Sequence, residues 1–414
     1  MVYQPPTGAR DLFPLDVAQK RWIEDRVQQV FHRWGYHRII TSTLERIDTL
    51  MAGGAVQRST VILVQDRDEE ELGLRPELTA SIARAAATRL AGMTYPQRLY
   101  YNANVFRRSP RSGMGSQHEF YQAGVELLGA DGSAADAEVL LLLSDCIGNL
   151  GLTDWHLILG EAGLTRSLLS VFPDSVRESV RRAIAYLDRL QLEALPLSPE
   201  LRERALLLLD LRGRPADVIQ RVSALDLDDQ QRNTVNALKS LLELLHDSFS
   251  REHRSPPNLV LDLSLVQTFD YYTGIVFEVV SSGDSGQRVL GQGGRYDQLL
   301  SLYHPQQQTC PGIGFTFNIE DLHQVLLPTG QLPAQTPPSD WLVVPKTPEA
   351  IAAAFAYAQT IRDSAHLVRV EVDLMPRDSE EATRQYARDR RIGQIAWIAT
   401  DGTPEVEPLL GRSP

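Results

Sequence analysis

Ten residues two thirds of the way along the chain decide how the whole sequence is interpreted: Leu265-Val266-Gln267-Thr268-Phe269-Asp270-Tyr271-Tyr272-Thr273-Gly274. They place an acid and two neighbouring phenols directly before a glycine, and the β-like segment 275–280 follows them. A Tyr-Tyr pair by itself usually belongs to a core or to a strand surface. The meaning of this stretch therefore depends on the polar motifs that surround it in the chain.

Length and composition exclude several classes of protein. The 414 residues favour two or three domains, and 43% hydrophobic with 23% charged residues is ordinary for a soluble globular protein. We expect no membrane span, no secretory signal and a cytoplasmic location. The net charge of -12 argues against non-specific binding to RNA. Cys146, Cys310 and the histidines form no zinc-type cluster, and no P-loop or dinucleotide fingerprint occurs, so we expect neither a metal nor a cofactor.

The pattern of residues 1–165 predicts mixed helix and strand. Apolar residues recur at helical spacing in 16–34, and Gly35 follows as a stop signal. The β-like segments 99–107 and 119–128 flank a Ser/Gly-rich loop, which predicts a long hairpin. Ser133 with Asp136 predicts a capping box at the start of a helix through Ile147. We also expect strands at 36–40, 61–65 and 73–75 and a helix at 78–90.

The composition changes after about residue 165. Leu, Arg, Glu and Asp dominate residues 166–255 without convincing strands, which predicts a helical insertion. Because β character resumes at 258–263, 275–280 and 312–317, the first domain is expected to be split into 1–165 and 256–327. The Pro/Thr/Gln-rich run 328–340 is typical of a linker. Alternating strands and helices then predict a small α/β domain at 341–414, with strands at 341–344, 367–372 and 394–398 and helices at 348–364 and 379–390.

Three further motifs carry polar groups that can line a binding site. Glu77 and Thr79 offer acceptors to an ammonium group, although Pro76 and Glu77 alone would more simply mark a helix start. Gln122 and Glu126 are four residues apart in a predicted strand, so they face the same side, which is either a site or a solvated hairpin face. The stretch Gly293-Gly294-Arg295-Tyr296-Asp297 lets backbone approach a ligand closely, although a Gly-Gly pair alone usually makes a turn.

Together these motifs resemble those of class II histidyl-tRNA synthetases over almost the whole chain. The matching stretches are Gly8-Ala9-Arg10-Asp11-Leu12-Phe13-Pro14, 74–80, 105–107, 120–126, 270–274, 293–297 and 311–322. The resemblance implies an α+β fold, with a class II synthetase-like antiparallel sheet flanked by helices and a shortened anticodon-binding-like α/β domain. It also implies a pocket for histidine, in which Glu126 accepts a hydrogen bond from the imidazole. The implied pocket residues are Glu77, Thr79, Arg107, Gln122, Glu126, Gln267, Tyr271 and Tyr272.

The chain departs from the synthetases at two charges that serve catalysis. Gln267 stands where the family has an arginine at the amino acid carboxylate, and Asp321 stands where an arginine clamps the ATP γ-phosphate. Losing one such partner typically costs about 2–5 kcal/mol. For the two together we expect a barrier increase of roughly 5 kcal/mol or more, which is about four decades in rate. Ser42 replaces a proline of the dimer motif. The C-terminal region lacks a clear final strand and helix, and Lys346 is its only lysine after Pro345, so we expect no tRNA binding.

This combination resembles the regulatory subunits of ATP phosphoribosyltransferase, which are paralogues of the synthetases without synthetase catalysis. The resemblance implies no catalytic residue in this chain and a short-form catalytic subunit as its partner. It further implies dimers within a hetero-oligomer and feedback by free histidine on the first step of histidine biosynthesis. Two other interpretations stay open from the residues alone: a divergent histidyl-tRNA synthetase, and an RNA-binding regulator on the same scaffold.

Overall fold

The computed structural model describes residues 3–65, 70–108, 117–251, 256–265, 272–283, 286–375 and 377–409. The chain forms two compact units, Met1–Pro333 and Ala334–Pro414. Their boundary falls within the Pro/Thr/Gln-rich run of residues 328–340. Among the described residues, no helix is long and apolar enough to cross a membrane.

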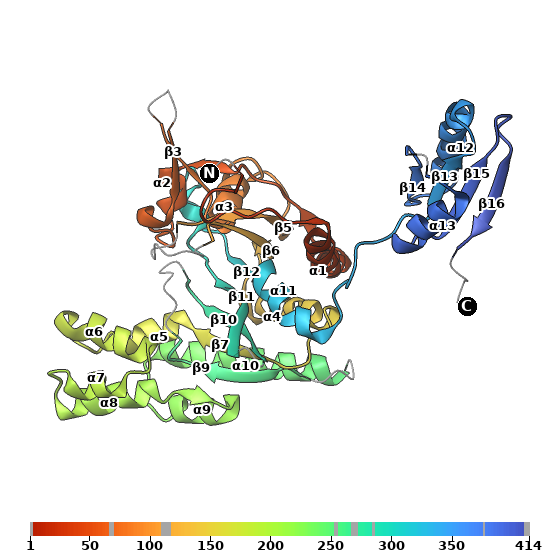
Figure 1. The fold of residues 1–414 in the computed structure, drawn as a ribbon. Helices are drawn as coiled ribbons and strands as arrows, with labels where there is room; N and C mark the ends of the chain where they lie inside the picture. The colour runs from red at the N-terminus through yellow and green to blue at the C-terminus, as the bar shows by residue number, and fades with distance from the viewer. Residues whose placement is uncertain are drawn as a thin grey trace. The chain divides into compact units, whose positions relative to one another are not determined.

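A nine-stranded mixed sheet forms the centre of the first unit, in the order β1-β5-β6-β12-β11-β10-β7-β9-β8 (Figure 1). Its middle strands pair antiparallel, while β1 with β5 and β7 with β9 are parallel. The strands are β1 (His37–Arg38), β5 (Gln97–Phe106), β6 (Glu119–Leu128), β7 (Trp155–Glu161), β8 (Arg212–Gly213), β9 (Asn258–Asp262), β10 (Ile275–Gly283), β11 (Gly286–Arg295) and β12 (Gly312–Asn318). The sheet with its flanking helices confirms the predicted α+β class.

Helix α1 (Pro14–Arg33) packs against α4 (Gly132–Asn149), α11 (Ile319–Leu326) and strand β6. Helix α4 packs against β12, and α11 packs against both β6 and β12. The apolar stripe expected for the first helix is real, because Ile23, Val27 and Val30 are fully buried. The predicted capping box of α4 is wrong. Asp131 is the N-cap and accepts the Gly132 N–H at 2.7 Å, whereas Asp136 is buried and pairs with an arginine of β11.

Two smaller parts complete the first unit. A three-stranded sheet, β2 (Leu44–Arg46), β4 (Glu71–Leu74) and β3 (Ile62–Gln65), lies beside α2 (Ile47–Met51) and leads into α3 (Thr79–Thr88). The inserted region is helical as predicted: α5 (Ala162–Leu169), α6 (Asp174–Ala185), α7 (Arg189–Ala194), α8 (Pro199–Leu209), α9 (Pro215–Ser223) and α10 (Asp229–Arg251). The expectation that it holds no strand is wrong, because β8 pairs with β9 at the sheet edge. Short 3-10 turns lie at Arg58–Thr60, Leu300–Leu302 and Leu327–Thr329.

The second unit is a small α/β sandwich. Its sheet has the order β14-β13-β15-β16, and only β16 runs antiparallel. The elements are β13 (Trp341–Pro345), a 3-10 turn (Pro348–Ala350), α12 (Ile351–Ser364), β14 (Val370–Val372), α13 (Glu380–Asp389), β15 (Gln394–Ile398) and β16 (Pro404–Pro408). The expectation that a final strand is missing is therefore wrong. Two prolines mask β16 in the sequence, and an edge strand tolerates proline because one side of it pairs with nothing.

Candidate functional site

A narrow cavity opens over the middle of the large sheet, between β5, β6, β11 and β12 and the start of α3. The free space at its centre is about 50 Å³, and about 480 Å³ when the side-chain crevices and the open mouth are included. Six of the eight residues predicted for the pocket line it: Glu77, Thr79, Arg107, Gln122, Glu126 and Tyr272. The other two, Gln267 and Tyr271, lie outside the described residues, as does Asp270.

Strand register explains how residues distant in sequence meet here. Strands β6 and β12 pair antiparallel, with Glu126 opposite Gly314 and Gln122 opposite Asn318. Gln122 and Glu126 are both buried and both line the cavity, as expected for residues four apart in one strand. A Cβ atom on Gly314 would lie 2.0 Å from Glu126 Oε2. The same Cβ would lie 2.4 Å from the backbone carbonyl oxygen of Val125, which cannot move aside as a side chain can. Glycine is therefore required at residue 314.

Glu126 is the most deeply enclosed acid of the cavity, with 1% of its surface exposed. It accepts a hydrogen bond from Thr79 Oγ1 at 2.8 Å and another from the hydroxyl of Tyr296. Burial raises the pKa of Glu126 to about 8, and these two donors only partly offset that effect. At neutral pH the empty site therefore holds a largely protonated carboxyl. A ligand N–H that donates to this group favours its ionised form, and the proton is released to solvent.

Glu77 has two roles. Its carboxylate accepts the backbone N–H groups of Thr79 at 2.5 Å and Ala80 at 3.0 Å, so it caps the start of α3. It also lines the cavity, where burial raises its pKa. The helix-start interpretation and the pocket interpretation both apply to Glu77. Thr79 joins the two acids, because its backbone donates to Glu77 while its hydroxyl donates to Glu126.

Arg107 and Tyr272 close two sides of the cavity. Arg107 Nε donates to the Pro76 carbonyl at 2.8 Å, and burial of the guanidinium lowers the pKa of Arg107 although part of the side chain is exposed. Tyr272 is buried, and a Cβ on Gly294 would come within 2.8 Å of its ring. The glycines of β11 therefore let the backbone of this strand pack directly against the ring of Tyr272. Sequence reasoning gave this motif no strand, because glycine is depleted in strands.

The sequence missed several wall residues of the cavity. Tyr296 was quoted only as part of the glycine motif, yet its hydroxyl bonds Glu126. Tyr101 is buried on β5, and burial raises its pKa well above its usual value. Gln292 and Thr316 also line the cavity, from β11 and β12. Only the period-two alternation of these strands could have indicated their direction, and it does not distinguish a cavity from packed core.

Asp321, the acid that replaces the synthetase arginine, does not line this cavity. It lies on α11, where Arg288 Nη1 of β11 contacts its Oδ1 at 2.6 Å. Its negative charge is therefore matched within the chain, and the repulsion expected toward a phosphate is reduced. Residue 321 nevertheless offers no positive charge to a phosphate, because it is an aspartate where the synthetases have an arginine.

A buried ion pair holds in place the segment that carries Tyr296 and packs against Tyr272. Arg295, with 6% of its side chain exposed, contacts Asp136 of α4 at 2.7 Å and Asp297 at 3.0 Å. Asp297 also accepts the Thr273 hydroxyl at 3.0 Å. The Gly293–Asp297 motif therefore links α4, β11 and the residue that follows Tyr272. Within the described residues no group of three or more His, Cys, Asp or Glu side chains is placed to hold a metal ion.

Known proteins that are similar to this chain identify its family. The histidyl-tRNA synthetase family model matches residues 8–322. An ATP phosphoribosyltransferase regulatory subunit from Nostoc punctiforme is 67% identical over 99% of this chain and 100% of its own length. The chain belongs to this family of regulatory subunits. A further regulatory subunit, from a Cyanothece species, is 61% identical over the same shares of the two chains.

Solved structures agree with the fold. The regulatory subunit/histidyl-tRNA synthetase from Bacillus halodurans C superposes with a TM-score of 0.79 at 27% identity, over 96% of this chain and 99% of that one. A histidyl-tRNA synthetase from a Nostoc species gives a TM-score of 0.77 at 19% identity, over 98% and 97%, and shows the fold alone. The predicted class II synthetase-like architecture is thereby confirmed. The chain therefore shares its overall fold with both a regulatory subunit/synthetase and a histidyl-tRNA synthetase.

Proposed function

We propose that this chain binds a short-form ATP phosphoribosyltransferase catalytic subunit, is needed for its activity, and makes it sensitive to free histidine. The observation that carries the proposal is the cavity around Glu126, in a chain 67% identical to a named regulatory subunit. In this proposal the chain has no catalytic residue and acts as a dimer within a cytoplasmic hetero-oligomer. Its partner supplies the chemistry, and this chain supplies the sensor.

The groups around the cavity suit the two ends of histidine. Glu126 offers a carboxyl to an imidazole N–H, while Glu77 and Gln122 offer oxygens to an ammonium group. A ligand shifts a protein between two states only by binding one of them more tightly, so feedback requires that histidine fit one conformation of this narrow cavity better than another.

Two features support a role without amino acid activation. Gln267 replaces a cationic group expected at the ligand carboxylate, and Asp321 is committed to Arg288 rather than available as a phosphate clamp. In the second unit, Arg384 is held by Glu407 at 2.8 Å and Arg388 contacts Glu381 at 2.9 Å. These arginines are matched by acids of the same unit, which supports the absence of tRNA binding.

The test is a histidine titration of catalytic-subunit activity, with and without this chain, after co-elution has established the complex. We expect activation by the chain and inhibition by histidine, with a coupling of about 1–3 kcal/mol or roughly 5- to 150-fold. Glu126→Ala should weaken histidine binding by about 1–3 kcal/mol, because it leaves polar partners unmatched. Glu243→Ala, which removes an exposed acid, serves as the control. Superimposable titration curves with and without the chain, in a confirmed complex, contradict the proposal.

Because the histidyl-tRNA synthetase family model matches the chain, one alternative function is that of a divergent histidyl-tRNA synthetase. The same preparation distinguishes it through histidine-dependent exchange of pyrophosphate into ATP. A regulatory subunit gives no exchange above background, whereas exchange at ordinary synthetase rates overturns the proposal.

A further inference from the structure

A second cavity lies in the C-terminal unit, at the edge where its parallel strands end. It has a volume of about 510 Å³, within the range of roughly 300–1,000 Å³ that is typical of small-molecule sites. From this cavity and its lining we infer that the C-terminal unit binds a small organic anion, a carboxylate or phosphate carried on a flat apolar body. The inference does not depend on the histidine site, because every lining residue belongs to the second unit.

Strand topology places the cavity where open α/β sheets bind ligands. The order β14-β13-β15-β16 means that the chain leaves β13 toward one side and leaves β15 toward the other. Helices α12 and α13 cover opposite faces, since Val343 packs with Ala354 and Leu342 packs with Ala387. A crevice therefore opens beyond the carboxyl ends of β13 and β15, which is the topological switch point. Val344 and Lys346 at the end of β13 line the cavity, as does Trp397 of β15.

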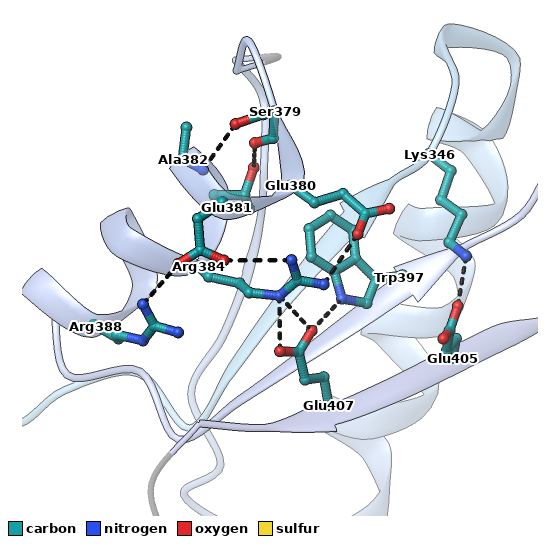
Figure 2. A network of polar contacts seen from close by, with 11 residues as sticks. Lys346, Ser379, Glu380, Glu381, Ala382, Arg384, Arg388, Trp397, Glu405 and Glu407 are labelled. Atoms are coloured by element: carbon teal, nitrogen blue, oxygen red, sulfur yellow. Dashed lines mark hydrogen bonds and ion pairs between the residues drawn. The ribbon is translucent and has the colours of Figure 1, made fainter.

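Among the charged side chains that line the cavity, Lys346 is the one best placed to exchange its present partner for a bound anion. Asp373 is held by Arg377 and accepts the Met375 N–H at 3.3 Å, so this acid is neutralised in place. Glu380 contacts Arg384 at 3.0 Å (Figure 2), and its side chain is 60% exposed. Lys346 Nζ contacts Glu405 Oε2 at 2.5 Å (Figure 2), and the side chain of Glu405 is 72% exposed. The hydrogen bond to Glu405 raises the pKa of Lys346, and Glu380 lies near enough to add to this effect. An exposed pair of this kind contributes little, so the ammonium group can turn to a bound anion.

The remaining walls suit a flat apolar body. Trp397 is buried, its indole N–H is satisfied by Glu407 at 3.0 Å, and the Arg384 guanidinium lies over its ring at 5.5 Å from the centroid. The part of the ring that lines the cavity offers an apolar surface. Leu374, 69% exposed, adds an aliphatic group to the lining, and Ile351 adds another. Helix α13 begins at this edge with Ser379 as its cap, and Glu380 and Glu381 already place negative charge in its first turn. The preference for an anion therefore rests on Lys346, and the apolar walls favour a planar body.

The experiment uses the full-length chain and ligand-observed NMR with two anionic probes, indole-3-acetate and phenyl phosphate, to separate a carboxylate from a phosphate preference. Indole-3-acetamide and phenol are their uncharged counterparts. We expect saturable binding of at least one anion, with millimolar affinity ordinary for fragments of this size. The uncharged counterpart should bind about fivefold more weakly, as is ordinary for one exposed charge contact.

Lys346→Gln should weaken the anion about fivefold and leave its uncharged counterpart unchanged. Lys239→Gln is the matched control, because Lys239 is also paired with an exposed glutamate, at 3.9 Å, but in the first unit. Leu374→Ser should weaken both members of a probe pair. The melting temperatures of the variants should equal that of the wild type, since both residues are exposed at the mouth of the cavity.

Three results overturn the inference. One is the absence of saturable binding by either anion, and another is binding that Lys346→Gln leaves unchanged. The third is labelled tRNA bound by the wild type and released by Lys346→Gln while neither small anion binds, which would make this edge an RNA-binding face. None of these results bears on the histidine titration, which depends on residues of the first unit.

Discussion

Glu126 offers a direct test of the electrostatics of the cavity. Its pKa is about 8 in the folded chain against 4.5 for the ordinary side chain. Between these pH values the folded state holds a proton that the unfolded state has lost, so the free energy of unfolding falls as pH rises. Each pH unit in this window removes about 1.4 kcal/mol, so raising the pH from 5 to 9 should remove roughly 4 kcal/mol. Above the folded pKa the loss is complete and constant.

The assay compares wild type with Glu126→Gln by urea denaturation at several pH values from 5 to 9. The amide does not titrate, so the variant should lack the part of the pH dependence that Glu126 supplies. Glu161, whose pKa burial raises to about 7, acts in the same direction in both proteins and cancels in the comparison. The contribution of the separate C-terminal unit cancels for the same reason.

We expect the variant to gain roughly 4 kcal/mol relative to wild type between pH 5 and pH 9, on top of a constant offset from the new amide N–H groups. Glu243→Gln, which replaces an exposed carboxyl, should run parallel to wild type. If Glu126→Gln also runs parallel to wild type across the whole range, Glu126 is ionised in the empty site, and the reasoning about its burial is wrong.

Three further expectations concern the same region. Histidine affinity should rise about fivefold from pH 7 to pH 8, because the ionised fraction of Glu126 grows from about one tenth to about one half; calorimetry showing weaker binding at pH 8 would mean that the protonated carboxyl is the binding form. Gly314→Ala should displace that carboxyl, abolish histidine binding and destabilise the chain by roughly 1–3 kcal/mol or more in urea denaturation, and unchanged binding would show that the site does not need it. Asp136→Asn should lower the free energy of unfolding by roughly 3–5 kcal/mol, because it leaves buried Arg295 without this partner. Asp297→Asn should lower it less, because Asp297 is more exposed. Equal losses in urea denaturation would mean that Asp136 is not the main partner of Arg295.

Local chemistry allowed much of the fold to be predicted from the sequence. The hairpin of β5 and β6, the inserted helices and the alternation in the C-terminal unit all follow from hydrophobic period and turn residues. The strands that were not predicted are β2, β7, β8, β11 and β16. β11 is rich in glycine and β16 is bounded by prolines, so local propensity argues against both. They are strands because neighbouring strands satisfy their backbone groups.

For the site, the sequence determined which side chains are present, and the tertiary structure decided what each of them contacts. Glu126 and Tyr296 are 170 residues apart, and no periodicity indicates that the hydroxyl bonds the carboxyl. The same holds for Asp321, whose partner Arg288 follows only from the placement of α11 against β11. Residue identity and spacing act over a few residues, whereas burial and hydrogen-bond partners are set by the assembled sheet. The raised pKa of Glu126 is therefore a property of the fold.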